Sequence, residues 1–367
     1  MEPNKEKRSG AIKLIAIIAT NLLCVAAAII LLFRFVITPN SRYTTALSLM
    51  AADQYEDAVH IFEDLDDYKD SAAKITECRY LAATALMDEE KYADAITAFE
   101  ALGDYKDSAD KILACQTAIT DGQYNAAMAL FDSRQYQQAV DAFGALGDYK
   151  DSAQMIFECY KGSFAMELET VRVGDTFTFG VFEQDGDTSN GAEKIQWQVL
   201  AKEDSRILVI SKDGLDCRKY HDTYEAVVWE NCSLRKWLNQ DFLEGAFEPW
   251  EQELIPTVQV SPDRNPKYRT YSGRATEDQV FLLSIAEAYR YFPIGGMRLC
   301  IPTKYAISKG AWVSDNGHCY WWLRSPGDTQ KDAAGIFAGL GGVHEGGNDV
   351  NNEENIVRPA LWIDLDP

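Results

Sequence analysis

The stretch that decides the fold of the N-terminal half is DYKDSA, which occurs at Asp67–Ala72, Asp104–Ala109 and Asp148–Ala153. The copies are 37 and 44 residues apart, and a cysteine follows the first residue of each copy by eleven positions. Self-similarity at such a spacing is the signature of a repeat architecture. The hexamer therefore marks an internal repeat rather than an isolated tag.

A second block shared by the three units lies at 54–65, 91–102 and 135–146. Each copy has a tyrosine, an alanine three residues later, a phenylalanine four after that and a leucine three further on. These offsets place the four side chains on one face of a helix. After a short turn, we expect the first aspartate of the hexamer to cap a second helix, because its short carboxylate can accept bonds from free amides. The predicted caps are Asp67, Asp104 and Asp148.

The third unit is seven residues longer than the second, and the extra residues fall near 121–123. Seven residues add about two helical turns, which keeps the buried face in phase. Cys78, Cys115 and Cys159 hold equivalent positions, where a small apolar side chain suits a contact between helices. Because equivalent positions in stacked repeats are about one repeat apart, we expect these three thiols to be free.

An apolar run of 20 residues, LIAIIATNLLCVAAAIILLF (14–33), precedes the repeats. At about 1.5 Å per residue it can cross a hydrocarbon core of about 30 Å. Basic residues are more frequent before the run than directly after it, which predicts a cytoplasmic N-terminus and an extracellular C-terminal domain. We therefore expect a cytoplasmic stub at 1–13 and a transmembrane anchor at 14–37 of a single-pass protein in the cell membrane. A cleaved signal peptide is the alternative.

Two helices per unit with a Tyr, Ala, Phe pattern resemble tetratricopeptide repeats, over residues 43–168. The sequence departs from that pattern because DYKDSA takes the place of the usual closing proline. The resemblance implies an all-α stack of helical hairpins. Such a stack could act as a stalk that spaces the C-terminal domain from the membrane, or it could bind a peptide partner on its concave face.

The chain is strongly acidic, with a formal net charge of −22, although its first 42 residues carry six basic and two acidic side chains. So acidic a body repels nucleic acid and anionic lipid headgroups. We therefore expect no nucleic-acid partner, and the membrane partner is the apolar run alone.

From residue 171 to residue 367 short β-rich segments alternate with turns rich in Gly, Asp and Asn, and helical segments follow. This mixture predicts an α+β domain, so the chain as a whole is multidomain. The four cysteines of this domain could pair as Cys217–Cys232 and Cys300–Cys319, but spacing fixes no connectivity. Strands are expected at 175–182, 195–200 and 206–211, and helices at 233–247 and 282–292.

The ordered set FGVFEQ, IQWQVL, VVWENCSLRKWLN, FLLSIAEAYRYF, WWLRSPG and VRPALWI resembles a domain of unknown function of Gram-positive surface proteins. The end of the set is also similar to C-type-lectin-like domains of the formylglycine-generating-enzyme type. That second resemblance implies a compact, irregular β-sandwich-like fold whose termini come together and whose loops bind ligands. The late cysteine pair of those enzymes is missing after Cys319, so the resemblance implies no oxidase activity.

The second resemblance rests on Trp321, Trp322, Arg324 and Arg358, which are the predicted ligand-binding residues. Indole rings stack on the apolar faces of sugars, and a planar guanidinium can hydrogen-bond hydroxyls or carboxylates. The alternative is structural. Alternate side chains of a strand face opposite sides, so one tryptophan would lie in the core and Arg324 in a buried ion pair.

The loop at 346–359 is rich in carboxylates and amides, the oxygen ligands that calcium prefers. The predicted calcium ligands are Asp349, Asn351 and Glu353, with a solvated polar loop as the alternative. We expect no other cofactor. The four histidines are scattered and no GxSxG elbow is present, so we predict no catalytic residue, although His318 or His344 could act as a base.

These observations predict a membrane-anchored bacterial cell-surface protein in which a non-catalytic head binds a glycan, a wall component or a protein ligand. The helical repeats would be the stalk of that head. One alternative is an enzyme that acts on cell-envelope material. The other is a scaffold whose repeats recruit protein partners.

Overall fold

The computed structural model describes residues 5–365, with side chains described from residue 12 onward. It divides into two compact units, one ending at Ala126 and the other beginning at Ala127. The first four residues of the predicted stub, 1–4, lie outside the described residues. Each unit is described below by itself.

The first unit begins with one continuous helix, formed by α1 (Lys5–Leu32), a π-helical turn at Phe33–Ile37 and α2 (Thr38–Met50). Pro39 has no N–H to donate to the preceding turn, which accounts for the local π-helical geometry. Among the described residues, this is the one helix long and apolar enough to span a membrane, a test that a signal sequence also meets. The predicted span of 14–37 therefore continues without a break into the first repeat.

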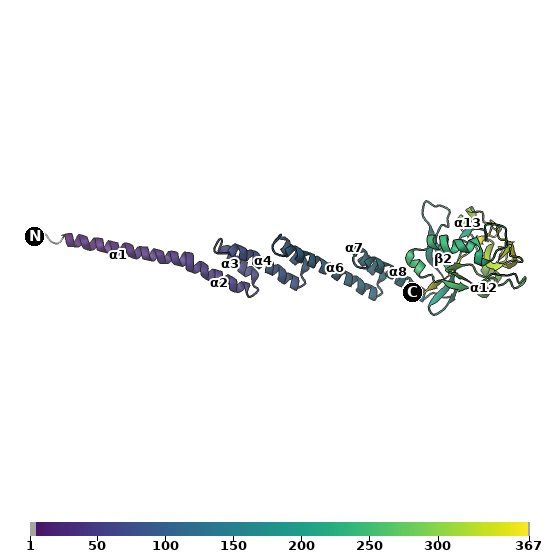
Figure 1. Ribbon diagram of the computed structural model, residues 1–367, viewed down its shortest axis with the longest axis horizontal. Helices are drawn as coiled ribbons and strands as arrows, with labels where there is room; N and C mark the ends of the chain where they lie inside the picture. The colour runs from purple at the N-terminus through teal and green to yellow at the C-terminus, as the bar shows by residue number, and fades with distance from the viewer. Residues whose placement is uncertain (1–4, 366–367) are drawn as a thin grey trace. The chain divides into compact units, whose positions relative to one another are not determined.

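Helical hairpins fill the repeat region, as the tetratricopeptide-like pattern predicts (Figure 1). The alanine and the phenylalanine of each shared block are fully buried, and so are the three repeat cysteines. The seven extra residues of the third unit lengthen one helix, α6, to 25 residues, against 18 in α4, which confirms that prediction. The remaining helices are α3 (Tyr55–Asp64), α4 (Ser71–Asp88), α5 (Tyr92–Glu100), α6 (Ser108–Asp132), α7 (Tyr136–Leu146) and α8 (Ser152–Glu169).

The predicted caps at the first aspartate of each hexamer are wrong, because the helices begin at the serine of the hexamer. The lysine before the second aspartate is in the left-handed region, with φ of 55° at Lys69, 52° at Lys106 and 50° at Lys150. A left-handed residue interrupts a right-handed helix and costs about 1–2 kcal/mol. The first three residues of the hexamer therefore form a turn, and the helix starts only after it.

Contacts with the helix that precedes the hairpin, α2 for the first copy, hold this turn in place. The Tyr43 hydroxyl donates a hydrogen bond to the carboxylate of Asp70, and the Lys69 ammonium lies 4.4 Å from the centre of the Tyr43 ring. The next unit repeats this arrangement with Tyr80 and Asp107. The hexamer is thus the place where one hairpin attaches to the helix before it.

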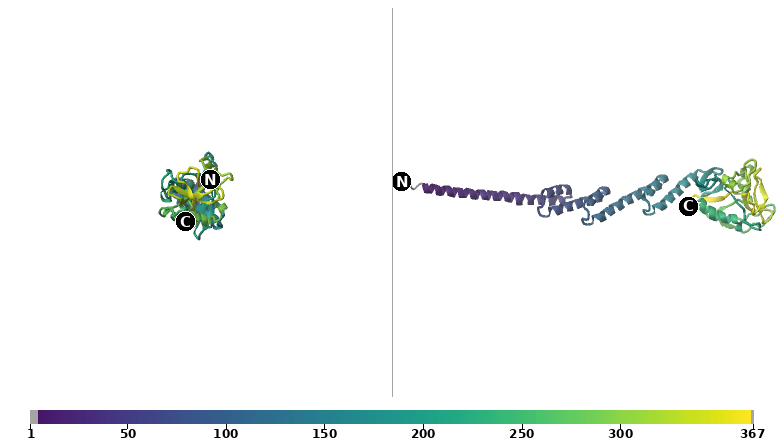
Figure 2. Two further views of the ribbon diagram at one scale, coloured as in Figure 1. Left: turned by 90° about the vertical axis from the view of Figure 1, so that its right-hand side faces the viewer. Right: turned by 90° about the horizontal axis from the view of Figure 1, so that it is seen from above.

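The second unit contains a domain with two five-stranded sheets and long connecting loops (Figures 1 and 2). The strand orders are β1-β2-β3-β12-β7 and β10-β9-β8-β11-β4, and β5 pairs with β6 separately. The predicted strands at 175–182, 195–200 and 206–211 correspond to β1, β2 and β3. The strands are β1 (Thr176–Phe182), β2 (Glu193–Lys202), β3 (Arg206–Ser211), β4 (Asp216–Cys217), β5 (Val258–Val260), β6 (Thr276–Asp278), β7 (Val280–Phe281), β8 (Trp321–Pro326), β9 (Asp332–Ile336), β10 (Val343–Asp349), β11 (Ile356–Val357) and β12 (Ala360–Asp364).

Short helices connect these strands. The predicted helix at 233–247 is present as α9 and α10 with a π-helical turn between them, and the predicted helix at 282–292 is present as α12. The capping box between Ser284 and Glu287 fixes the start of α12. The helices are α9 (Ser233–Trp237), α10 (Leu243–Ala246), α11 (Pro249–Glu253), α12 (Ile285–Tyr291) and α13 (Lys304–Ser308).

The last repeat helix, α8, packs into the core of this domain. Phe164 stacks on Phe179 of β1 with ring centres 4.9 Å apart, and Leu168 is fully buried in the same core. The Lys202 ammonium donates to the carbonyls of Leu168 and Glu169 at 3.0 and 3.1 Å, which satisfies free carbonyls at the end of α8. α8 ends at Glu169, and its residues Phe164 and Leu168 belong to the hydrophobic core of the domain that follows.

Candidate functional site

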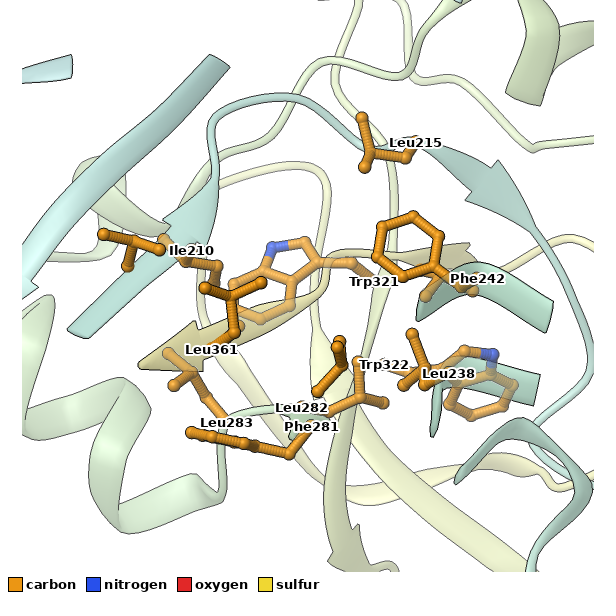
Figure 3. Close-up of a cluster of buried hydrophobic side chains, with 14 of the residues drawn as sticks. Ile210, Leu215, Leu238, Phe242, Phe281, Leu282, Leu283, Trp321, Trp322 and Leu361 are labelled. Carbon is orange, nitrogen blue, oxygen red and sulfur yellow. The ribbon is translucent and has the colours of Figure 1, made fainter. Parts of the chain in front are cut away.

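The predicted ligand-binding tryptophans, Trp321 and Trp322, lie on β8 and are fully buried. β8 runs between β9 and β11, and every residue along it is buried. The Trp321 indole donates to the carbonyl of Arg298 and the Trp322 indole to that of Arg218, both at 2.8 Å. Figure 3 shows both rings among apolar side chains that come from several elements. Neither ring has an exposed face on which a sugar could stack.

The two predicted arginines are also buried. The Arg324 guanidinium forms an ion pair with Glu287 on α12 and donates to the carbonyl of Leu282 at 2.8 Å. Arg358 donates to the carbonyl of Ser211 at 2.8 Å. A buried charge is costly unless a counter-charge or hydrogen bonds compensate it; Arg324 has both, and Arg358 is held by the carbonyls of Ser211 and Lys212. The geometry therefore supports the structural interpretation of all four residues.

The predicted calcium ligands lie at the end of β10 and in the loop between β10 and β11. Asp349 and Glu353 are exposed, and Asn351 is half-buried. The Glu353 carboxylate pairs with the Lys219 ammonium at 2.9 Å, and this hydrogen bond lowers the pKa of Glu353. The Glu353 carboxylate is thus already paired with a cationic side chain, which would compete with a calcium ion for the same oxygen. The loop in this geometry fits the solvated alternative.

A different acidic group comes together among the described residues, formed by Glu183, Asp185 and Glu193. The Glu193 carboxylate accepts a hydrogen bond from the backbone amide of Gln184 at 2.7 Å, and Asp185 accepts one from the amide of Asp187 at 2.7 Å. These bonds brace the turn between β1 and β2, which explains why the carboxylates are close together.

An aromatic cavity of about 270 Å³ opens among the loops of the second sheet. Trp312 lies beyond α13 and Phe337 directly follows β9, and these two side chains are 50% and 46% exposed. Tyr320, directly before β8, packs edge-on against Phe337 with ring centres 5.8 Å apart. The lining residues are Trp312, Tyr320, Phe337, Ala338, Gly339, Asn348, Glu354 and Asn355.

Backbone hydrogen bonds hold the walls of this cavity. The amide of Trp312 donates to the carbonyl of Glu354 at 3.1 Å, and the amide of Ile356 donates to that of Tyr320 at 2.9 Å. The segment at 354–356 is therefore tied by main-chain bonds to Trp312 and to Tyr320, and the bridge between Val313 and Cys319 joins these two in turn. The aromatic rings at the opening are carried on a fixed frame rather than on free loops.

Polar groups converge on the same cavity. The Asn348 side-chain amide donates to Asn355 Oδ1 at 3.2 Å, while Asn355 Nδ2 is buried without a hydrogen-bond partner among the described residues. The Tyr320 hydroxyl and His344 Nδ1 are 2.9 Å apart. Burial raises the pKa of Tyr320 and lowers the pKa of His344, so both groups are held in their neutral forms. The cavity thus offers neutral donors and acceptors, together with the exposed carboxylate of Glu354.

Sequence reasoning favours the adjacent pair Trp321 and Trp322 and passes over Trp312 and Phe337. A signal for Trp312 is present, because it is the lone aromatic residue of a polar segment, KGAWVSDNG (309–317). A large ring in a segment that is otherwise mostly polar is less suited to a core than a ring inside an apolar run. Phe337 carries no such signal, since it ends the apolar run AAGIF.

The first unit has a larger hollow of about 880 Å³ between α3, α4 and α5. Val59, Leu86 and Leu102 give it apolar walls, and Arg79 pairs with Glu63 across it at 2.9 Å. A peptide partner of the repeats would bind here. That partner stays a prediction.

Two family models match parts of the chain. Residues 204–365 match a domain of unknown function (DUF6273), and residues 26–102 match anaphase-promoting complex, cyclosome, subunit 3, a tetratricopeptide-like repeat. Comparison with curated proteins and with solved structures finds no match. The chain thus carries helical repeats of tetratricopeptide type followed by a sheet-containing domain of unknown function.

Proposed function

We propose that the C-terminal domain binds a saccharide, without catalysis, in the aromatic cavity of Trp312, Tyr320 and Phe337. The observation that carries the proposal is the pair of half-exposed rings beside a buried amide that lacks a partner. The C–H faces of a sugar ring can cover exposed aromatic faces, while its hydroxyl and carbonyl groups can satisfy amides. Such a combination of apolar walls and few polar groups is typical of small-ligand sites.

The size and charge of the cavity favour a neutral sugar over the other ligands. A volume of about 270 Å³ is just below the range of about 300–1,000 Å³ for ligand pockets, which suits one or two sugar rings better than an extended peptide. The carboxylate of Glu354 repels anionic ligands such as uronic acids. Asn355 Nδ2 is covered in this structure, so an acceptor oxygen of the ligand reaches it only when the Asn355 side chain turns toward the cavity.

The proposal places this domain outside a bacterial cell, as the lectin-like head of a single-pass membrane protein. Its support is the apolar N-terminal helix with basic residues before it. The lectin-like fold is part of the proposal. It is favoured by the first sheet, which contains both β1 and β12 and so brings the two ends of the domain together. Loops between strands supply the rings of the cavity, as that fold implies.

The test is a calorimetric titration of the full-length protein in detergent micelles with neutral, amino and uronic oligosaccharides. Trp312→Ala and Phe337→Ala should each weaken binding of the neutral sugars by at least about tenfold. The matched control is Tyr271→Ala, which removes an aromatic ring of similar exposure, 54%, that does not line the cavity.

Equal affinity of the wild type and Trp312→Ala would reject the cavity as the site. No binding of any saccharide in the panel would reject the proposed function. Release of shorter sugars during the titration, detected by mass spectrometry, would favour the alternative of an enzyme acting on cell-envelope material.

A further inference from the structure

Cys300 and Cys319 lie side by side in the second unit. The backbone amide of Cys319 donates to the carbonyl of Cys300 at 2.9 Å, and the Cys319 thiol lies 3.3 Å from the same oxygen. The side chains of Cys300 and Cys319 are also hydrogen-bonded to each other. Disulfide bonds span Cα separations of roughly 4.4–6.8 Å, and two residues joined by a direct main-chain hydrogen bond and a contact between their thiols are close enough for such a bond.

The other two cysteines of the domain have different partners. The Cys217 thiol donates to the carbonyl of Glu353 at 2.9 Å. Cys232 caps the start of α9, where its sulfur accepts from the amide of Arg235 at 3.4 Å. All eight cysteines are free thiols in this structure. Of the two pairings that the sequence leaves open, the geometry therefore favours Cys300 with Cys319.

We propose that Cys300 and Cys319 are a site of disulfide formation that closes the segment between them. The reaction is thiol–disulfide exchange with a small-molecule disulfide such as oxidised glutathione. One cysteine thiolate attacks the disulfide and releases one glutathione thiol as a mixed disulfide forms. The second cysteine thiolate then displaces the other glutathione, so the protein is oxidised by two electrons and two glutathione thiols are produced.

Both thiols are almost fully buried, at 2% and 1% exposure. Exchange therefore takes place while the chain folds or when the segment opens, and the finished bond is shielded from reductant. The closed segment contains α13 and Trp312, one wall of the aromatic cavity. A cross-link around about twenty residues removes open states of the unfolded chain, which raises the thermal midpoint of this unit by roughly 6–12 °C.

The inference stands apart from the proposed saccharide function and is tested by disulfide mapping. The full-length protein is unfolded in urea with reductant and refolded in detergent micelles with a mixture of oxidised and reduced glutathione. Free thiols are then alkylated before proteolysis and mass spectrometry. We expect a peptide joining Cys300 to Cys319, with Cys217 and Cys232 alkylated.

Alkylation of all four domain cysteines, or a bridge from Cys300 to any other cysteine, would overturn the proposal. Refolding without oxidised glutathione should lower the thermal midpoint of the wild type by the stated amount. The thermal midpoint of Cys319→Ser should not depend on oxidised glutathione, whereas that of the control Cys217→Ser should depend on it as in the wild type. Because the mapping uses the wild type, it remains decisive even if Cys319→Ser fails to fold.

Discussion

The cores of the helical repeats and of the C-terminal domain contain side chains of different size. In the repeat units of the first half, the buried residues are mainly alanine, cysteine and serine with one phenylalanine in each hairpin. In the C-terminal domain, large rings such as Trp197, Trp321 and Trp322 fill the interior, and they come from strands far apart in the chain. Small side chains permit close helix contacts between sequence neighbours, whereas large ones fill the wider space between sheets and their covering helices.

This difference determines how far the effect of a destabilising substitution spreads in each region. A repeat contacts only its neighbours, so its loss is local. The C-terminal domain has one continuous core, which also includes Phe164 and Leu168 of α8, so damage at its centre spreads throughout. The predictions below test that contrast.

The largest effect is expected for Trp321→Ala. The substitution removes a fully buried indole and leaves a cavity, which should lower the free energy of unfolding of the C-terminal domain by about 3–5 kcal/mol. Urea denaturation monitored by near-ultraviolet circular dichroism measures this change. The control Trp312→Ala, at a half-exposed ring, should change the same quantity by less than about 1 kcal/mol.

In the repeats, Phe99→Ala should cost about 3 kcal/mol, because Phe99 is fully buried with Ala83, Ala95 and Cys115. Hydrogen exchange should show faster amide exchange in α4 to α6 and no change in the strands of the C-terminal domain. Faster exchange in β8 after this substitution would contradict the local character of the repeats.

Glu287→Gln should lower the stability of the C-terminal domain by about 2 kcal/mol, because it leaves the Arg324 guanidinium buried without its counter-charge. This expected loss of stability is smaller than for a fully buried ion pair, because the Glu287 side chain is 29% exposed. The matched control is Glu230→Gln, whose partner Arg274 is 81% exposed. Its cost should be under about 1 kcal/mol, and equal costs for the two variants would contradict this account.

Acidification should destabilise the repeats through Asp107 and stabilise the C-terminal domain through Asp216, because the pKa of the first carboxyl is lowered and that of the second is raised. The hydrogen bond from Tyr80 holds the pKa of Asp107 below its ordinary value of 3.8. A carboxyl with a lowered pKa stabilises the fold above 3.8, and that contribution is lost as the pH falls through the folded-state pKa. Tyr80→Phe should therefore flatten the acid-induced loss of repeat helicity below pH 3.8, as measured by circular dichroism.

Asp216 in the C-terminal domain behaves in the opposite way. Burial raises its pKa above 3.8 although the Arg218 guanidinium is 2.6 Å away. Its contribution to stability is present below 3.8 and is lost as the pH rises through the raised pKa. Asp216→Asn removes this ionisation. The free energy of unfolding of the variant should therefore stay level across that pH window, whereas that of the wild type declines. Parallel pH profiles would contradict the assignment.

The repeats were predictable because each core position occurs three times in the sequence. Tyr, Ala, Phe and Cys recur in register, so the buried face follows from alignment alone. The helix starts were not predictable, because the turn with the left-handed lysine of DYKDSA is held by contacts with the helix that precedes the hairpin. In the C-terminal domain several strands and helices followed from local patterns, together with Arg324 in an ion pair.

The aromatic cavity could not be derived in the same way. Its walls at Trp312, Tyr320 and Phe337 are brought together by the bridge between Val313 and Cys319, by the pairing of β8 with β9 and by main-chain bonds to the segment at 354–356. A sequence pattern reports the spacing within one segment and carries no information about which loops meet. The adjacent tryptophans attract attention in the sequence, yet the sheet places both of them inside.

The central claim is that Trp312 meets the ligand while Trp321 and Trp322 are structural. Nitrogen-15 labelling of the tryptophan indoles in the full-length protein gives one N–H resonance for each side chain. On addition of the saccharide that binds in the calorimetric panel, we expect the Trp312 resonance to shift and those of Trp321 and Trp322 to stay in place. A shift confined to Trp321 and Trp322, with Trp312 unchanged, would contradict the account.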